Sequence, residues 1–159
     1  MNYYNEIKKE LINNEVTKKV KTYSINKSDL DTYYNVGKLL SEAGRHYGEG
    51  IIKEYSKRLT NELGKGYSQR NLWMMLKLYN LGEKMQTLSA QLTYSHYVEL
   101  LPYDDINKIE YYINICEQQN LSVRQLRERI KSKEYERLPE DTKNKLITNN
   151  ELAREYMLV

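Results

Sequence analysis

The sequence predicts an all-α fold of six or seven helices organised around a central helix-turn-helix. Apolar residues recur at three- and four-residue spacing along most of its 159 residues, which is the period of an amphipathic helix. No stretch alternates apolar and polar residues for long enough to indicate a strand. Two prolines and seven glycines also leave little room for the many turns of a large sheet. At this length the chain can form one domain with a hydrophobic core.

The N-terminal segment, residues 1–27, is expected to form a polar helix with a thin apolar stripe. The stripe consists of Ile7, Leu11, Ile12, Val16 and Val20. It could pack on the core, or it could extend as a dimerisation arm and pair with a second copy of the chain. The main helical domain is expected over residues 28–138. Ser28 is suited to cap its first helix, which should end near Gly44.

The central helix-turn-helix is expected between Ile51 and Leu81. The apolar face of its first helix is formed by Ile51, Ile52, Tyr55, Leu59 and Leu63. Gly64-Lys65-Gly66 should end that helix, because glycine tolerates the left-handed backbone of a helix end. Ser68 is a good N-cap for the second helix, since its hydroxyl can accept a hydrogen bond from a free backbone N–H group. Tyr67 and Leu72 can pack together across this helix start as a hydrophobic staple.

Two further helices are expected after the central pair. Thr93 or Ser95 should open a short helix that ends at Pro102, because proline cannot continue a helix. Asp104 or Asp105 should begin the next helix, since aspartate is a favourable N-cap residue.

The clearest helix start in the chain lies near residue 122. Ser122 and Gln125 have the spacing of a capping box, and Leu121 and Leu126 have that of a hydrophobic staple. The helix that follows is expected to end before residues 139–159, a polar segment that we interpret as a linker or a partly disordered tail.

Catalytic and metal-binding patterns are weak. His46 and His96 are far apart, and the single Cys116 lies on an apolar helix face, so we predict neither a zinc site nor an internal disulfide. His96 is expected to cap a helix or to lie at the surface. Glu6-Ile7-Lys8 matches the Glu-x-Lys letters of a metal-dependent nuclease, but it lacks a strand pattern and a partner acid. We therefore predict no catalytic residue, no metal site and no cofactor.

The sequence has no signal-peptide pattern and no apolar run long enough to cross a bilayer, which predicts a cytoplasmic protein without a membrane partner. The sixteen tyrosines occur without any phenylalanine, and we attribute most of them to the base composition of an AT-rich genome.

The formal net charge is only +3, but the charges are unevenly distributed. Residues 51–90 carry seven basic and three acidic side chains, and residues 121–138 carry six and three. Residues 91–120 between them carry one basic and five acidic side chains. Clustered basic side chains are typical of proteins that bind polyanions, although charged helix faces more often only contact solvent.

Duplex DNA is the favoured ligand of the central helix-turn-helix. We expect the segment that begins at Ser68 to enter a major groove, where Arg70 can pair with guanine and Gln69 or Asn71 with adenine. Ser68 and the free amides of the helix start could hold a phosphate. The contacts to the DNA backbone are assigned to Lys65, Lys77, Arg124, Arg127 and Lys131. The last three form one stripe on a later helix, and they could instead pair with the acidic segment around Asp104.

Three linked segments resemble the N-terminal domain of the YhcG-type bacterial proteins. The segments are GEGIIKEYSKRLTNELGKGYSQRNLWMMLKLY, LTYSHYVELL and LSVRQLRERIKSKEYERL, and their order and spacing agree from about Asp29 to Leu138. The resemblance implies a helical domain that binds DNA and usually precedes a nuclease domain of the PD-(D/E)XK class. Because the sequence ends where that nuclease would begin, it implies a stand-alone, degenerate or shortened version without catalysis. The last two segments also resemble, more weakly, the helix-turn-helix part of ParB-type partition proteins.

The alternative function is a protein-interaction module, such as an adaptor or inhibitor, without nucleic-acid binding. The apolar stripe of residues 1–27 and the many tyrosines would suit a dimer seam or a partner groove. A second copy of the chain, a nuclease domain or another protein would then be the partner. Salt separates the two functions, because DNA binding weakens steeply as salt rises and an apolar protein interface does not.

Overall fold

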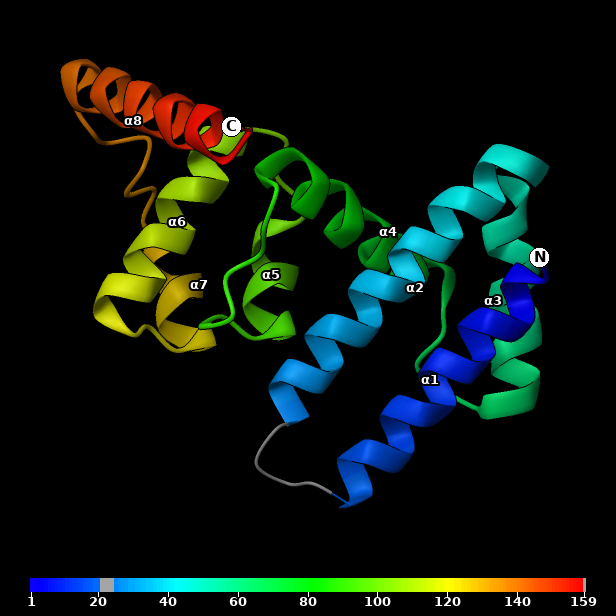
Figure 1. Cartoon of the computed structure of the whole chain (residues 1–159). Helices are drawn as coiled ribbons and strands as arrows, with labels where there is room; N and C mark the ends of the chain where they lie inside the picture. The colour runs from blue at the N-terminus through cyan, green and yellow to red at the C-terminus, as the bar shows by residue number, and fades with distance from the viewer. Residues whose placement is uncertain (21–24, 159) are drawn as a thin grey trace. The chain divides into compact units, whose positions relative to one another are not determined.

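The all-α architecture is confirmed for the residues that the computed structural model describes, 1–20 and 25–158 (Figure 1). These residues form eight helices and no strand, so the predicted count of six or seven is too low. The helices divide into two compact units, Met1–Lys84 and Met85–Val159, which we call unit 1 and unit 2. No helix in the described ranges is long and apolar enough to cross a bilayer.

Unit 1 contains three complete helices and all but the last residue of a fourth. They are α1 (Tyr3–Val20), α2 (Ile25–Tyr47), α3 (Gly50–Leu63) and α4 (Gln69–Met85). The α1 and α2 helices lie side by side and antiparallel, and α3 packs against α2 (Figure 1). All four helices contribute to one core, whose members include Tyr4, Ile7, Leu11, Val36, Leu40, Ile52, Leu59, Leu72 and Met75.

The buried face of α1 differs from the predicted stripe. Its buried side chains are Tyr4, Ile7, Leu11 and Asn14, which follow the three- and four-residue spacing of one helix face. Ile12 and Val16 are instead 38% and 57% exposed, and the side chain of Val20 lies outside the described part of the chain. The α1 helix therefore packs on the core through a different face, while pairing with a second copy stays a prediction.

The ends of α2 also differ from the predicted ones. The helix begins at Ile25, before Ser28, whose side chain is outside the described part. It continues past Gly44 to Tyr47, and the chain turns at Gly48, which has a φ of +86°. Because side chains disfavour this left-handed backbone, the helix ends at the glycine that adopts it and not at the one that precedes it.

The α2 and α4 helices approach each other closely at Gly37. A Cβ atom at this position would lie 2.1 Å from the carbonyl oxygen of Met75 and 2.9 Å from the Cβ atom of Tyr79. The first of these contacts is with backbone, which cannot move aside as a side chain does. Glycine at position 37 is therefore needed for this crossing.

Unit 2 contains the remaining four helices. They are α5 (Tyr94–Leu100), α6 (Ile106–Gln119), α7 (Val123–Lys131) and α8 (Glu140–Leu158). The α5 helix packs against α7, and α6 packs against both α7 and α8. Buried side chains of this unit include Leu92, Tyr97, Leu100, Ile109, Tyr112, Ile113, Cys116 and Leu126.

The predicted helix starts of unit 2 are confirmed. Thr93 is the N-cap of α5, and Asp105 is the N-cap of α6. At the start of α7, the Gln125 N–H donates to Ser122 Oγ (3.1 Å) while the Ser122 N–H donates to Gln125 Oε1 (2.8 Å). The capping box is therefore complete, so two backbone donors at this helix start are satisfied by side chains.

The α8 helix occupies the segment that we expected to be a linker or tail. Arg154 on α8 forms an ion pair with Glu110 on α6. Glu110 is buried, and this burial raises the pKa of its carboxyl group, an effect that Arg154 partly offsets. Since removing one partner of a buried pair leaves an uncompensated charge, this contact holds α8 against α6.

Candidate nucleic-acid interface

The connection between α3 and α4 has the backbone that its glycines predict. Gly64 and Gly66 have φ values of +97° and +109°, which residues with a side chain rarely adopt. Lys65 lies between them and is exposed. The connection therefore ends α3 sharply and places one cation in solvent just ahead of α4.

Tyr67 anchors this connection to two other helices. Its ring is buried, its hydroxyl donates to Glu15 on α1 (2.5 Å), and its carbonyl oxygen accepts from Ser56 Oγ on α3 (2.7 Å). Burial, followed by the hydrogen bond to Glu15, raises the pKa of Tyr67 above its ordinary value. The predicted partner Leu72 is buried in the same core. The sequence indicated the staple but not the anchors Glu15 and Ser56, because neither is close to Tyr67 along the chain.

Ser68 caps α4 as predicted. Its Oγ accepts from the backbone N–H of Asn71 (3.1 Å). The side-chain Nδ2 of Asn71 donates to the carbonyl oxygen of Gly66 (3.1 Å), so this amide braces the connection. As at any helix start, the backbone N–H groups of Gln69 and Arg70 lack an acceptor within the helix.

The predicted DNA-reading side chains of unit 1 all face solvent. We call them the α4 edge, which consists of Lys65, Ser68, Gln69, Arg70, Asn71 and Lys77, and all six residues are exposed. The opposite face of α4 is held in the core by Leu72, Met75, Leu78 and Leu81. Arg70 and Lys77 are seven residues apart, which places them on one face about 10 Å apart along the axis. Neither they nor Lys65 form an ion pair with any residue in the described ranges.

The remaining predicted contacts lie in unit 2, on the α7 stripe of Arg124, Arg127 and Lys131. All three are exposed, but Arg127 donates to Glu99 on α5 through Nη2 (2.6 Å) and Nε (3.0 Å). Arg124 lies 3.7 Å from Glu128 one turn later on the same helix. Arg127 therefore forms a structural pair, as one of the two alternatives for this stripe predicts, although its partner is Glu99 and not Asp104 or Asp105. Arg124 pairs within α7, and Lys131 has no ion-pair partner among the described residues.

Other basic side chains of residues 121–138 are also paired within unit 2. Arg129 binds Glu134 through two hydrogen bonds of 2.9 and 2.7 Å and reaches Gln119 with a third. Lys108 of α6 binds Glu136 (2.7 Å). Contacts made within unit 2 therefore leave fewer basic side chains of this segment free to bind a ligand.

His96 and Cys116 occupy structural positions. The Thr93 N–H donates to Nδ1 of His96 (3.1 Å), which leaves Nε2 to donate to the carbonyl oxygen of Leu121 (2.8 Å). The capping role predicted for His96 is therefore confirmed. Cys116 is buried, and burial raises the pKa of its thiol to about 11. Within the described part of the chain, no group of three or more His, Cys, Asp or Glu side chains could hold a metal ion.

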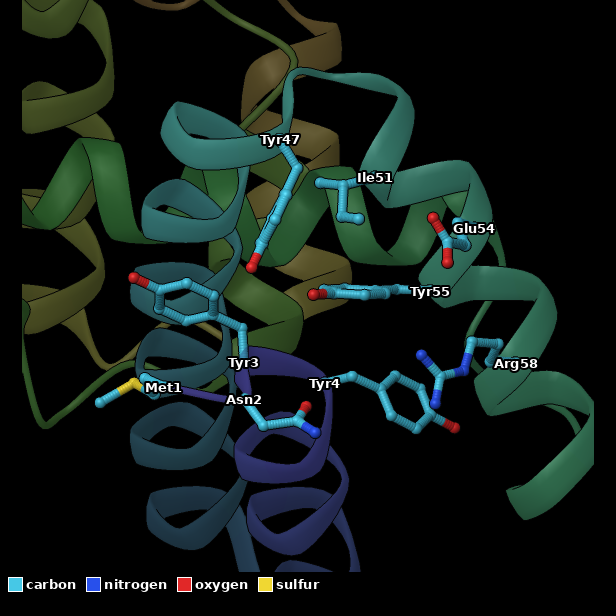
Figure 2. Close-up of a pocket in the computed structure, with 9 residues that line it drawn as sticks. All are labelled: Met1, Asn2, Tyr3, Tyr4, Tyr47, Ile51, Glu54, Tyr55 and Arg58. Carbon is cyan, nitrogen blue, oxygen red and sulfur yellow. The ribbon is translucent and has the colours of Figure 1, made fainter.

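Unit 1 also contains a pocket that the sequence did not indicate. It lies where the start of α1 meets the end of α2 and the first turns of α3 (Figure 2). Tyrosines from all three helices line it. Sequence spacing could not reveal it, because its walls come together only through the packing of these helices.

One family model matches most of the chain. It is that of the DUF1016 N-terminal domain, and it covers residues 6–137. The match confirms the first of the two resemblances drawn from the sequence, and nothing supports the weaker likeness to ParB-type proteins. No curated protein and no solved structure matches the chain.

Proposed function

Because the chain belongs to the family of DUF1016 N-terminal domains, the N-terminal domain of YhcG-type proteins, we propose that it binds duplex DNA without catalysis of its own. The α4 edge is the proposed contact surface. The observation that carries this proposal is the set of three exposed cations, Lys65, Arg70 and Lys77, which have no ion-pair partner among the described residues.

Unpaired cations support a polyanion ligand for an energetic reason. A cation that already contacts a carboxylate must lose that contact before it can bind a phosphate, whereas an exposed free cation loses only water and counterions. The three free cations of the α4 edge therefore retain their full electrostatic attraction for DNA. The mild net charge of the whole chain does not reduce it, because exposed charges more than roughly 8–10 Å apart are screened at physiological salt.

The geometry of the α4 start suggests separate roles for its side chains. Arg70 lies in the first turn, where a helix-turn-helix protein contacts base edges, and its guanidinium can donate two hydrogen bonds to guanine. Gln69 can pair with adenine through one donated and one accepted hydrogen bond. Asn71 has its Oδ1 atom and one of its two Nδ2 hydrogens left for DNA, since the other hydrogen binds the carbonyl oxygen of Gly66. Lys65 and Lys77 are assigned to phosphates, together with the backbone N–H groups of the helix start.

The α7 stripe is assigned a smaller share of the affinity. Arg127 would have to give up its contacts to Glu99 to bind a phosphate. Arg124 would have to give up only a longer contact of 3.7 Å to Glu128, and Lys131 has no ion-pair partner among the described residues, so both can form additional phosphate contacts on unit 2. This ranking makes the α4 edge the part of the proposal to test first.

The test compares the natural chain with the double variant Lys65→Ala/Arg70→Ala. We expect the variant to bind a fluorescent duplex about 10- to 100-fold more weakly in an anisotropy titration, which corresponds to roughly 1.4–2.8 kcal/mol for the two lost contacts together. The slope of log K against log salt should also become shallower by about 1 to 2.

The matched control is Lys53→Ala/Lys57→Ala, which removes the same charge from exposed positions on α3. It should lower the affinity by less than about threefold, because surface charge away from the contact acts only through screened long-range attraction. Equal losses in both double variants would contradict the proposed contact surface. Absence of salt-dependent duplex binding by the natural chain would leave the protein-interaction alternative.

A further inference from the structure

The pocket of unit 1 is large enough to hold a small molecule. Its volume is about 400 Å³, within the range of roughly 300–1,000 Å³ that is usual for ligand pockets. Most of its walls are aromatic or polar side chains on α1, α2 and α3. The side chains that the argument uses are Tyr3, Tyr47, Glu54, Tyr55 and Arg58.

Three tyrosines surround the open space. Figure 2 shows the hydroxyl ends of Tyr47 and Tyr55 pointing toward the same region, beside the ring of Tyr3. The rings of Tyr3 and Tyr47 are 6.4 Å apart and nearly perpendicular, at 78°. These residues offer one ring for stacking and two hydroxyl groups for hydrogen bonds to the edge of a flat ligand.

Tyr55 contributes to the pocket a hydroxyl group that is free to bind a ligand. The residue is only 5% exposed, yet its hydroxyl forms no hydrogen bond with any group in the described part of the chain. The hydroxyl oxygen itself is not buried, because it opens into the pocket. Water or a ligand in the pocket can therefore supply its hydrogen bond.

Two charged side chains on α3 define the polarity of the ligand. The guanidinium of Arg58 lies 3.6 Å from the centre of the Tyr4 ring, which holds it at the pocket wall. It has no carboxylate ion-pair partner among the described residues, so it can bind an anion such as a phosphate. Glu54 lies one turn earlier on the same helix and can accept a hydrogen bond from an amino group.

A quaternary ammonium ligand fits this arrangement less well. Such cations bind the faces of aromatic rings, whereas Tyr47 and Tyr55 present their hydroxyl ends. The free cation of Arg58 would also repel them. An entirely apolar ligand would leave the Tyr55 hydroxyl and both charges unsatisfied.

We propose that this pocket binds a single nucleotide whose base carries an exocyclic amino group, such as adenine or cytosine. The base stacks on Tyr3 and receives hydrogen bonds from Tyr47 and Tyr55, Glu54 accepts from its amino group, and Arg58 binds its phosphate. The nucleotide is either a free mononucleotide or an unpaired nucleotide at the end of a DNA strand. This site goes beyond the proposed duplex contact, since it shares no residue with the α4 edge.

In the first experiment, the natural chain and its variants are titrated with dAMP, and chemical shift changes in NMR spectra detect the binding. We expect a dissociation constant below about 1 mM and a loss of about tenfold in Tyr55→Phe, which removes one hydroxyl and retains the ring. Arg58→Gln should lower the affinity for dAMP by a similar factor. It should leave the affinity for deoxyadenosine unchanged, because deoxyadenosine has no phosphate. Binding of dTMP should be weaker than that of dAMP, because thymine has no amino group for Glu54.

Lys57→Gln is the control, because Lys57 is an exposed neighbour on α3 that does not line the pocket. Thermal melting of every variant shows whether unit 1 stays folded. The proposal is overturned if neither dAMP nor a single strand binds at millimolar concentration, or if Tyr55→Phe and Arg58→Gln bind as the natural chain does while remaining folded.

A second experiment identifies the source of the nucleotide. It compares dAMP with a duplex that carries a single unpaired adenine nucleotide and with the same duplex made blunt. Tighter, Tyr55-dependent binding of the overhang than of the blunt duplex supports a strand end, and equal affinity for the two duplexes, together with binding of dAMP, supports a free nucleotide. Lys65→Ala/Arg70→Ala should weaken binding of the blunt duplex but not binding of dAMP. Failure of one proposal is therefore distinguishable from failure of the other.

Discussion

The starts of α4 and α7 are built alike but differ in what surrounds their charges. Each has a serine cap, Ser68 or Ser122, and each is preceded by a residue whose carbonyl oxygen accepts a side-chain hydrogen bond from another helix. Tyr67 accepts from Ser56 (2.7 Å), and Leu121 pairs with Nε2 of His96 (2.8 Å).

The difference lies in the basic residues that follow each cap. Arg70 of α4 has no ion-pair partner among the described residues, whereas Arg127 of α7 is held by Glu99. The two helix starts therefore have similar sequence signals and different electrostatic surroundings. A basic helix start in a sequence does not by itself indicate a free cationic surface, because packed neighbours decide how much charge remains.

The largest expected effect is on DNA affinity. Lys65→Ala/Arg70→Ala should cost about 10- to 100-fold, while Arg124→Ala/Arg127→Ala should cost less than about threefold. The reason is that Arg127 already donates hydrogen bonds to Glu99 and would have to break them to bind DNA. Anisotropy titrations of the two variants in the same buffer measure both losses. A greater loss from the α7 variant would reverse the ranking of the two helix starts.

The next effect is on stability. His96→Ala removes the hydrogen bond to Leu121 and one half of the α5 capping box, so we expect unit 2 to lose about 2–3 kcal/mol of unfolding free energy. Ser56→Ala removes the corresponding bond to Tyr67 in unit 1 and should cost about 1 kcal/mol. Urea unfolding measures both losses. His96→Gln keeps a donor and an acceptor and should recover part of the loss, and a cost of His96→Ala below that of Ser56→Ala would contradict the expectation.

A smaller effect separates capping from binding. Ser68→Ala and Ser122→Ala should each lower stability by about 1 kcal/mol, because each removes the oxygen that accepts a backbone N–H. Only Ser68→Ala should also weaken duplex binding, by a few-fold. Thermal melting and anisotropy measured on the same samples test both statements. Equal loss of DNA affinity in the two variants would mean that both helix starts contact DNA.

The smallest expected effect appears at alkaline pH. Because the pKa of Tyr67 is raised above its ordinary value of 10.0 in the folded chain, the stability of unit 1 should fall as pH rises above about 10. Tyr67→Phe cannot ionise and should show a shallower fall between pH 9 and 11. Ser56→Ala keeps the phenol and should show the full fall. Melting temperatures measured across this range give the fall in stability with pH. An identical fall for the natural chain and for Tyr67→Phe would contradict the role assigned to the Tyr67 phenol.

Local signals in the sequence predicted the connection between α3 and α4 and the starts of α5, α6 and α7. The glycines at 64 and 66, the cap at Ser68 and the capping box at Ser122 all have the structure expected, because each depends on neighbours within a few residues. The same holds for the exposure of the α4 edge, which follows from the apolar face of α4. Its contact with DNA is still a prediction.

Features that depend on distant residues could not be predicted in this way. The apolar stripe of α1 included Ile12 and Val16, but the core takes Tyr4 and Asn14 instead. Asn14 is suited to burial because its Nδ2 donates to Asp29 on α2 (2.8 Å), a partner fifteen residues away. The pairing of Arg127 with Glu99 is non-local in the same sense. The α8 helix lacked an apolar period, so its place against α6 became evident only from Arg154 and Glu110.

Gly37 has a practical consequence for redesigning the chain. Because α4 meets α2 there through backbone, the tilt of α4 is fixed on the side away from its exposed residues. Side chains of the α4 edge can therefore be exchanged in a library without turning the helix that carries them. Conversely, a single methyl group added at position 37 would shift all the outward positions together, which would alter recognition without changing any residue that a ligand touches.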